Sequence, residues 1–320
     1  MHTISRLFAI TALALASVAA PAEGSWPSKP LREVVPFAPG GNAETIMRLI
    51  QPAMSQALGQ PVIVDNKPGA GGTLGMQEVA LARDGHTVLA GVDTMLTINP
   101  HIYKNLRFKP SEDLLPVTTL ATFSQMLVCH PSVRARSVAE LLALARKQDM
   151  SYASGGPGVP GHMAMELLLA STKVKMTHVP YRGPSPAVQD IVAGNVPCGF
   201  LTSPVVGPFV RDGRLAALAV SGSKRLAGYP NVPTVAESGV KDYDATFGEI
   251  VAVPKGTPAA VIQRLSQEIR KNLALPEIRA RLAALDLDVV GDTPEEANHR
   301  VVAESRKWAE VASRIGLQVD

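Results

Sequence analysis

The chain has 320 residues, 46% of them hydrophobic and 18% charged, and a formal net charge of +3. A chain of this length and hydrophobic content can bury a sizeable core and is long enough for two domains, which excludes an intrinsically disordered protein. Its basic residues are dispersed along the chain and few aromatic residues lie beside them, which excludes a nucleic-acid-binding surface.

The first 22 residues have the composition of a secretory leader. Arg6 precedes an apolar run from residue 7 to 20, and the small residues at Ala20 and Ala22 offer a cleavage site. A basic start, an apolar stretch and small residues in this order are typical of a signal peptide, and the run is too short for a membrane span. We therefore expect residues 1–22 to be removed and the mature protein to be soluble and exported.

The first unit of the mature chain is a predicted strand at residues 31–37, a turn at Pro39-Gly40-Gly41 and a helix at residues 44–58. Such a unit presents unpaired backbone N–H groups at the positive end of a helix dipole. Glycines let a ligand approach the main chain because they lack a Cβ. We expect this turn to bind a carboxylate, and an ordinary turn between strand and helix is the alternative.

Two further strands, at residues 61–64 and 87–91, also end in polar or glycine-rich loops. The first of these loops, residues 65–72, is only superficially similar to a dinucleotide-binding loop, because the third glycine comes one position late, at Gly75. The second strand ends at Val92-Asp93-Thr94. Ligands of open α/β sheets bind beyond the carboxyl ends of the strands, so we expect these loops to converge on one cleft.

The pattern begins again in the second half of the chain. Two apolar stretches between residues 115 and 130 are interrupted at Thr122-Phe123-Ser124, and a glycine-rich loop from Ser154 to His162 then links a short strand to a helix. This loop supplies a second helix end suited to an anion. Further strands are predicted at residues 176–180, 198–201 and 215–220, with helices at residues 185–193 and 205–211. This alternation predicts a parallel sheet with helices on both faces.

An apolar run at residues 250–254 is expected to return the chain to the first sheet, which it leaves near residue 122. A helix to about Leu273 and a long helix capped by Thr293 then complete the chain. Two such crossings form a hinge. We therefore predict that residues 23–122 and 249–320 form lobe 1 and that residues 123–248 form lobe 2.

The two cysteines, Cys129 and Cys198, each lie in a predicted strand. In an oxidising compartment they can form a disulfide if the strands are neighbours, and two buried free thiols are the alternative. The sequence has no metal-site spacing, and we expect neither a metal nor a cofactor. Ser154 is the nearest candidate nucleophile, but it lacks the Gly-x-Ser-x-Gly motif and no His or acid is tied to it by a motif, so we do not expect an enzyme.

Eight segments come in the order of a known family: Trp26-Pro27-Ser28-Lys29-Pro30-Leu31, Val35-Pro36-Phe37-Ala38-Pro39-Gly40-Gly41, Leu58-Gly59-Gln60-Pro61-Val62, Asn66-Lys67-Pro68-Gly69-Ala70-Gly71-Gly72, Asn99-Pro100, His178-Val179-Pro180-Tyr181-Arg182-Gly183, Leu218-Ala219-Val220 and Val232-Pro233-Thr234-Val235-Ala236-Glu237-Ser238-Gly239. They resemble the solute receptors of tripartite tricarboxylate transporters, the Bug family. The resemblance implies a periplasmic binding protein with an α/β type II (Venus flytrap) fold, in which two doubly wound lobes are joined by a two-crossing hinge.

In that family a ligand carboxylate is typically held by backbone groups of two loops, partly through ordered water. On this sequence the loops are residues 37–42 and 154–158, the same two helix ends that the residue pattern indicates. The ligand-binding residues that the resemblance and the loop pattern imply are Phe37, Ala38, Pro39, Gly40, Gly41, Asn42, Gly91, Asp93, Thr94, Ser154, Gly155, Gly156, Gly158, His162, Tyr181 and Thr202.

Some of these residues have a second interpretation. Phe37 forms an apolar wall or belongs to the core, His162 donates to the ligand or lies on the helix surface, and Tyr181 contacts the ligand or seals the lobe. The third loop, with Gly91 and Asp93, faces the ligand or is a surface loop. Asp93 is unfavourable beside an anion, so we expect it to point away, to accept from a backbone N–H, or to meet a donor on the ligand.

Three departures from the family pattern bear on the ligand: Glu44 stands where many members have Asp, Leu201-Thr202-Ser203 lacks a frequent Asp, and residues 245–249 lack an aromatic motif. Together they favour a carboxylate without an amine, with an apolar or aromatic body. The resemblance implies a receptor, expected to be monomeric, that delivers this acid to the membrane subunits of a transporter. A sensor of the same fold that signals to a membrane kinase is the alternative.

Overall fold

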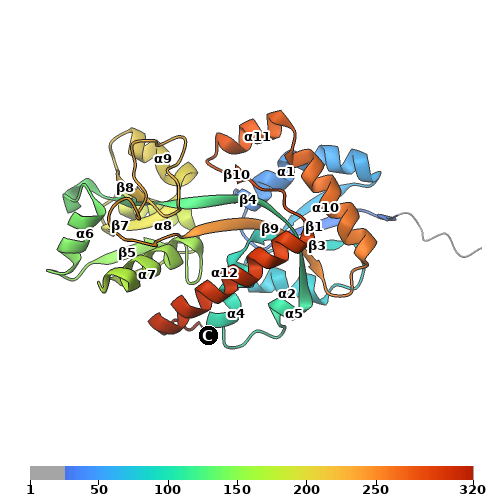
Figure 1. Ribbon diagram of the computed structural model, residues 1–320, viewed down its shortest axis with the longest axis horizontal. Helices are drawn as coiled ribbons and strands as arrows, with labels where there is room; N and C mark the ends of the chain where they lie inside the picture. The colour runs from blue at the N-terminus through green and yellow to red at the C-terminus, as the bar shows by residue number, and fades with distance from the viewer. Residues whose placement is uncertain (1–25, 320) are drawn as a thin grey trace, which may run out of the picture.

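Two α/β lobes lie side by side, and two long strands, β4 (Leu114–Cys129) and β9 (Thr246–Pro254), run between them (Figure 1). The computed structural model describes residues 26–319, so the predicted signal peptide lies outside the described residues. Within that range no helix has the length and apolar character needed to span a bilayer.

Lobe 1 is built on three parallel strands, β1 (Leu31–Val35), β2 (Val62–Asn66) and β3 (Thr87–Val92). β9 pairs antiparallel with β3, and β4 pairs with β9 and with the short β10 (Asp288–Val289). Every residue of β3 is buried, as expected for a strand covered on both faces. The helices of this part are α1 (Asn42–Leu58), α2 (Thr73–Leu81), α3 (Thr94–Thr97), α4 (Asn99–Ile102), α5 (Pro110–Asp113), α10 (Ala259–Leu273), α11 (Pro276–Ala283) and α12 (Pro294–Ile315).

Lobe 2 is built on a second group of parallel strands, β5 (Ser151–Ser154), β6 (Thr177–Pro180) and β7 (Cys198–Thr202). β4 pairs antiparallel with β7 on one edge and with β8 (Ala216–Val220) on the other. The helices of this part are α6 (Val138–Ala145), α7 (Pro160–Thr172), α8 (Pro184–Val192) and α9 (Ser203–Arg211). The carboxyl ends of β5 and β7 lead into α7 and α9, which places both helix starts at one end of the lobe 2 sheet.

One strand serves both sheets. β4 pairs with β9 as far as Ser124 and with β7 from Gln125 onward. The interruption of apolar residues at Thr122-Phe123-Ser124 therefore does not end a strand, since all three residues lie within one strand of 16 residues. Polar and apolar side chains alternate there because successive residues of a strand face opposite sides.

The last helix, α12, lies across the hinge strands and extends toward lobe 2 (Figure 1). Its buried Trp308 stacks on Phe247 of β9 with ring centroids 5.4 Å apart, and Phe247 in turn packs on Phe123 of β4. The cap predicted at Thr293 is confirmed and forms a capping box, since Thr293 and Glu296 cap each other's backbone N–H groups. Aromatic packing thus holds one helix against both strands of the hinge.

Candidate functional site

The first glycine loop connects β1 to α1 and lies at the surface. Phe37 is half-buried, whereas Ala38, Pro39 and Gly40 are exposed. Gly41 is the N-cap of α1, in an extended conformation and without a side-chain cap. The first N–H groups of α1 are therefore available to an anion from outside the helix. Gly40 has a φ of +95°, a conformation that any residue with a Cβ adopts only with strain.

A carboxylate of the protein itself already binds this loop. The N–H of Gly40 donates to Oε2 of Glu44 at 2.7 Å, and Nε of Arg48 donates to Oε1 of Glu44 at 2.7 Å. Burial acts to raise the pKa of Glu44, but the hydrogen bonds from Arg48 and Gly40 outweigh it and leave the pKa lowered. The loop thus favours a negative charge, and the Gly40 N–H is not free for a ligand.

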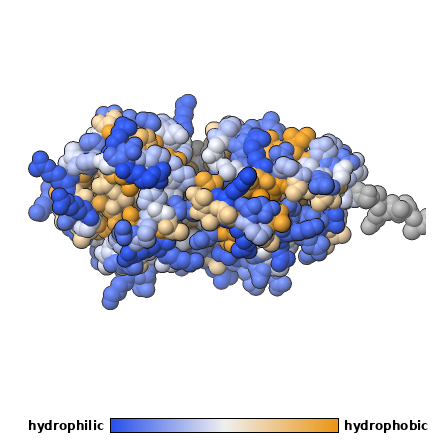
Figure 2. Space-filling view, turned by 90° about the horizontal axis from the view of Figure 1, so that it is seen from above, coloured by the Kyte–Doolittle hydropathy of each residue, from blue (hydrophilic) through white to orange (hydrophobic). Residues whose placement is uncertain are grey.

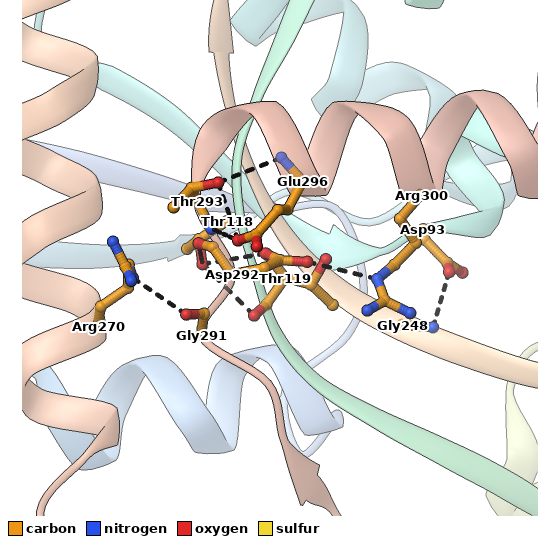
Figure 3. A network of polar contacts seen from close by, with 10 residues as sticks. All are labelled: Asp93, Thr118, Thr119, Gly248, Arg270, Gly291, Asp292, Thr293, Glu296 and Arg300. Atoms are coloured by element: carbon orange, nitrogen blue, oxygen red, sulfur yellow. Dashed lines mark hydrogen bonds and ion pairs between the residues drawn. The ribbon is translucent and has the colours of Figure 1, made fainter.

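The third loop of lobe 1 is buried rather than a surface loop. A Cβ on Gly91 would lie 2.6 Å from Cε of Met95, and Thr94 is buried at the start of α3. The N–H of Asp93 donates to the carbonyl of Gly248, and the N–H of Gly248 donates to Oδ2 of Asp93, both at 2.7 Å (Figure 3). The expectation that Asp93 accepts from a backbone N–H is confirmed. Its carboxyl joins α3 to the hinge strand β9.

Asp93 is a buried acid whose surroundings favour its uncharged form. It is 5% exposed, and its Oδ1 has no hydrogen-bond partner among the described residues. Burial, with a smaller contribution from the charge of Glu304, raises the pKa of Asp93 to about 8. The cost of a buried carboxylate is avoided by protonation.

The second glycine loop connects β5 to α7 and is held by two side chains. Oγ of Ser154 accepts the N–H of Gly156 at 3.1 Å and lies 2.7 Å from Nε2 of His178. Nδ1 of His162 accepts the N–H of Gly158 at 3.0 Å. Val159, the N-cap of α7, provides no side-chain cap. The N–H groups of Gly156 and Gly158 therefore stabilise the loop itself.

Two stacked imidazoles lie beneath this loop. The rings of His162 and His178 are 4.0 Å apart and nearly parallel, and Tyr152 stacks on His178 at 5.0 Å. Burial, aided by His178, lowers the pKa of His162 to about 3, and burial lowers that of His178 to about 4. Because Nδ1 of neutral His162 accepts a hydrogen bond, its proton is on Nε2, which lies 3.8 Å from Oε1 of Glu166.

The remaining predicted residues of lobe 2 are half-buried. The hydroxyl of Tyr181 donates to Oδ2 of Asp190 in α8, and burial raises the pKa of Tyr181 to about 12. The carbonyl of Gly155 accepts the N–H of Gly183 at 3.0 Å. Thr202 is the last residue of β7 and the N-cap of α9, where no side-chain cap is present. The start of α9, like that of α7, therefore lacks a side-chain cap.

The structure links the two glycine loops indirectly, through residues that were not among the predicted ligand-binding residues. A Cβ on Gly158 would lie 2.5 Å from Cδ1 of Ile102 and 3.4 Å from Oδ1 of Asn99, so lobe 2 touches lobe 1 here. Nδ2 of Asn99 donates to the carbonyl of Gly71 at 3.0 Å, and a Cβ on Gly72 would lie 3.1 Å from Cζ of Phe37. The available signals in the sequence are the Asn99-Pro100 motif and the glycine-rich loop of residues 65–72.

Glu249 is a further residue beside the first loop. It lies on β9 opposite Val92 and is 4% exposed. Burial, with the nearby Asp93, raises its pKa well above the ordinary value, although a hydrogen bond from the side chain of Asn42 acts the other way. The sequence marked Glu249 only as part of a missing aromatic motif. The structure shows an acid next to the first residue of α1.

A separate cavity of about 310 Å³ lies at the hinge and includes Asp93 but neither glycine loop. Its lining residues are Asp93, Thr122, Phe123, Ser124, Ser223, Lys224, Arg225, Leu226, Ala227, Asp244, Thr246, Phe247, Gly248, Ala283, Asp286, Leu287, Asp288, Arg300 and Glu304. The cations among them are paired with acids, Lys224 with Asp288, Arg225 with Glu237 and Arg300 with Asp292. A carboxylate would gain little from these cations, so we place the candidate site at the glycine loops.

Among residues 26–319 no group of three or more His, Cys, Asp and Glu residues could hold a metal ion. On the face of the molecule seen in Figure 2, small hydrophobic patches are interspersed with a hydrophilic surface, and the two lobes form distinct masses. The candidate site consists of the glycine loops and the buried polar side chains described above, from both lobes.

The family model described as "Tripartite tricarboxylate transporter family receptor" matches residues 46–317. The chain belongs to this family. A relative described as "UPF0065 protein in tcbD-tcbE intergenic region", from Pseudomonas sp. (strain P51), is 37% identical over 309 residues, which cover 95% of this chain and 92% of the relative. The protein BugT of Bordetella pertussis is 32% identical over 99% of both chains.

Solved structures agree with the family assignment. The structure described as "R. palustris Rpa4515 with adipate" superposes with a TM-score of 0.85 at 30% identity, covering 92% of this receptor and 99% of that chain. The periplasmic binding protein BugD superposes with a TM-score of 0.82 at 29% identity, covering 92% and 99%. The family and the two-lobed α/β fold predicted from the sequence are confirmed. Both are those of solute-binding receptors rather than of enzymes.

Proposed function

We propose that this receptor captures a small organic carboxylate between its two lobes in the periplasm and delivers it to the membrane subunits of a tripartite tricarboxylate transporter. The observation that carries the proposal is the contact of Gly158, in the glycine loop of lobe 2, with Asn99 and Ile102 of lobe 1. Each lobe also has a glycine loop at a helix start without a side-chain cap. Related structures are described with bound carboxylates, adipate for Rpa4515 and malate for MatC of Rhodopseudomonas palustris, the latter 29% identical with a TM-score of 0.82.

Apart from Gly91, Asp93, Thr94, Gly156 and Gly158, the predicted ligand residues fall into two groups. We propose that residues 37–42, Gly155 and Thr202 contact the ligand, mainly through the backbone N–H groups of the first turn of α1 and of Gly155. Ser154, His162 and Tyr181 are engaged in hydrogen bonds within lobe 2, so they act by holding that loop in place. Asn99, which joins the loops, is added to the site.

Closure follows from the contact between lobes. Gly158 of lobe 2 packs against Ile102 and Asn99 of lobe 1, so a ligand held by both loops favours the form in which they touch. We propose the lobe limits at residues 122 and 248 predicted from the sequence, next to the point where β4 exchanges β9 for β7 as its partner. The two hinge strands then carry the closing motion.

The buried acids bear on the ligand class. An amine on the ligand needs a carboxylate partner, but burial raises the pKa values of Asp93 and Glu249 and so favours the uncharged form of both acids. A protonated Glu249 beside Asn42 suits a carboxylate ligand, because an uncharged acid does not repel an anion. We therefore propose a carboxylate without an amine.

A thermal-shift screen tests this function. The ligand-free mature protein is measured against mono-, di- and tricarboxylates, aromatic acids and amino acids, with the methyl ester of each acid as its control. A ligand at 100 times its dissociation constant stabilises the folded state by about 2.7 kcal/mol, which raises the Tm by several degrees. One class of free acid raising the Tm while its esters do not supports the proposal. Equal effects of acids and esters would contradict it.

The same proposal includes the partner and the compartment. The family description names a transporter, which favours transport over signalling to a membrane kinase. We propose that the receptor is a monomer and that residues 1–22 direct it to the periplasm. Light scattering of the protein recovered from the periplasmic fraction, with its mass measured at the same time, tests both statements: a dimer or an uncleaved leader would contradict them.

A further inference from the structure

The two cysteines of the chain lie directly opposite each other on neighbouring strands. Cys129 ends β4, Cys198 begins β7, and the two residues are partners in the antiparallel register. The chain has no other cysteine among its 320 residues. Both side chains are fully buried and are free thiols in this structure. Two isolated cysteines placed opposite each other indicate a site for a covalent link.

The geometry of the ladder favours that link. The N–H of His130 donates to the carbonyl of Pro197 at 2.9 Å, so these two residues form a hydrogen-bonded pair of the antiparallel ladder. Hydrogen-bonded and non-hydrogen-bonded pairs alternate, which makes Cys129 and Cys198 a non-hydrogen-bonded pair with Cα atoms about 4.5 Å apart. Disulfides bridge Cα atoms from about 4.4 to 6.8 Å apart. The thiol of Cys198 donates to the carbonyl of Ser151 at 3.8 Å, and the same thiol is the largest cause of the raised pKa of Cys129.

We propose that Cys129 and Cys198 form a disulfide in the exported protein; this rests on the export included in the proposed function. The oxidant is a protein disulfide of a thiol–disulfide oxidoreductase. One cysteine thiolate attacks that disulfide to form a mixed disulfide, and the second thiolate then displaces the oxidoreductase. The two thiol protons pass to the oxidoreductase thiolates or to solvent, and two electrons pass to the oxidoreductase, which leaves as a dithiol.

Burial determines when the reaction occurs. The hydrogen bond with Cys198 and burial raise the pKa of Cys129, so the folded protein offers little thiolate. Neither side chain is exposed to an oxidoreductase once β4 and β7 have paired. The link therefore forms in the newly exported chain before lobe 2 has closed over it. A chain that folds in a reducing compartment keeps both thiols.

The link would enclose the second glycine loop. The segment from Cys129 to Cys198 contains residues 154–158 and both stacked histidines, His162 and His178. A disulfide stabilises mainly by restricting the unfolded chain, and more so for long segments. It would also fasten β7, whose last residue precedes α9, to the strand that continues into lobe 1. The proposal thus predicts a more stable lobe 2.

Thiol counting in the denatured protein tests the proposal. The receptor is produced with its own leader in a Gram-negative host, recovered from the periplasmic fraction, denatured without reductant and treated with iodoacetamide. We expect no alkylated cysteine in the mass spectrum, and two alkylated cysteines when a reductant is added first. Two alkylated cysteines without reductant would overturn the proposal. A covalent dimer would also overturn it, because the link would then join two chains.

The stabilising effect of the disulfide is measured by comparing the same protein in its oxidised and reduced states. The oxidised protein should have a Tm several degrees above that of the same protein produced and kept under reducing conditions. A double variant, Cys129→Ala with Cys198→Ala, controls for the reductant, since adding reductant should not change its Tm. Equal Tm values for both redox states would contradict the stabilising role. No ligand enters these measurements, so their failure leaves the carboxylate proposal intact.

Discussion

The two lobes hold ionisable groups whose pKa values burial shifts in opposite directions. Lobe 1 buries the acids Glu33, Asp93 and Glu249, whose pKa values are raised, whereas lobe 2 holds the buried His162 and the half-buried His178, whose pKa values are lowered. In all five groups burial disfavours the charged form. These acids and these imidazoles should therefore respond to pH in opposite directions, the acids to alkali and the imidazoles to acid.

The glycine loops show the same contrast. In lobe 1 the charged Glu44, paired with Arg48, accepts the N–H of Gly40. In lobe 2 the neutral His162 accepts the N–H of Gly158 from below the loop. One sequence pattern, a strand followed by a glycine loop and a helix, is thus supported by an ionic contact in one lobe and by a neutral one in the other.

The largest effect is expected where the lobes touch. A Cβ at position 158 would lie 2.5 Å from Ile102, and the φ of Gly158 is +72°. Overpacking costs about 1–3 kcal/mol, here only in the closed form, so Gly158→Ala should weaken ligand binding by about 5- to 150-fold. Titration calorimetry with an acid from the thermal-shift screen measures the change.

Gly213→Ala is the matched control for this variant. Gly213 has a similar φ, +69°, but a Cβ there meets nothing within 4 Å. It therefore carries the same backbone strain without the contact between lobes. Equal losses of affinity in the two variants would show that strain, not closure, is responsible.

The second glycine loop provides the next test. His162→Leu leaves the N–H of Gly158 without its acceptor, and an unpaired buried N–H costs about 1–3 kcal/mol, so affinity should fall by about tenfold. His162→Asn should recover most of it, because an Asn side chain can accept near the position of Nδ1. Calorimetry on both variants decides: if Asn and Leu lose affinity equally, the acceptor is not what matters.

The same histidine should make stability depend on pH in acid. The folded-state pKa of His162, about 3, lies below its ordinary value of 6.5. Its contribution to stability is therefore complete above pH 6.5 and is lost as the pH falls toward the folded-state pKa. The Tm of the wild-type protein should therefore decrease more steeply between about pH 6.5 and 4 than that of His162→Asn. Parallel curves would remove His162 from the acid response.

The dependence of stability on alkaline pH should come from Glu33, which lies on β1 just before the first loop. Both carboxyl oxygens lack a hydrogen-bond partner among the described residues, and burial raises the pKa to about 8. Its folded-state pKa exceeds the ordinary value of 4.5, so stability is greatest at low pH and is lost as the pH rises through about 8. The wild-type Tm should fall by a few degrees relative to Glu33→Gln between pH 5 and 9, which a pH series of thermal scans measures. A constant difference would contradict this.

The smallest effect is expected at Glu44, since one of the hydrogen bonds that stabilise its charge comes from the exposed Arg48. The pKa of Glu44 is lowered, so its contribution is present above the ordinary value and is lost as the pH falls through the lowered one. Glu44→Gln should have a slightly lower Tm than the wild type at pH 7, and the two should converge in acid. A gap that persists at low pH would indicate packing rather than charge.

Much of the fold follows from local sequence patterns. The strand, glycine loop and helix of residues 31–58 appear as predicted because apolar spacing and glycines act within a few residues. The same holds for the cap at Thr293. The continuity of β4 through Thr122-Phe123-Ser124 was less evident, because a strand shared by two sheets is fixed by its partners β9 and β7.

The candidate site was predictable in position more than in detail. Both glycine loops follow from the sequence, but the role of Asn99 depends on its hydrogen bond to Gly71 and on its contact with Gly158 in the other lobe. The orientation of His162 could not be predicted, since a histidine three residues into a helix faces solvent or core according to what packs on it. Such contacts join distant segments and leave no local pattern.

A crystal structure with the acid identified by the thermal-shift screen shows directly whether both glycine loops hold the ligand. We expect the ligand carboxylate between the lobes, accepting hydrogen bonds from backbone N–H groups of the first turn of α1 and of Gly155 in one molecule. A carboxylate in the hinge cavity beside Lys224 and Arg300, with both glycine loops unoccupied, would contradict it.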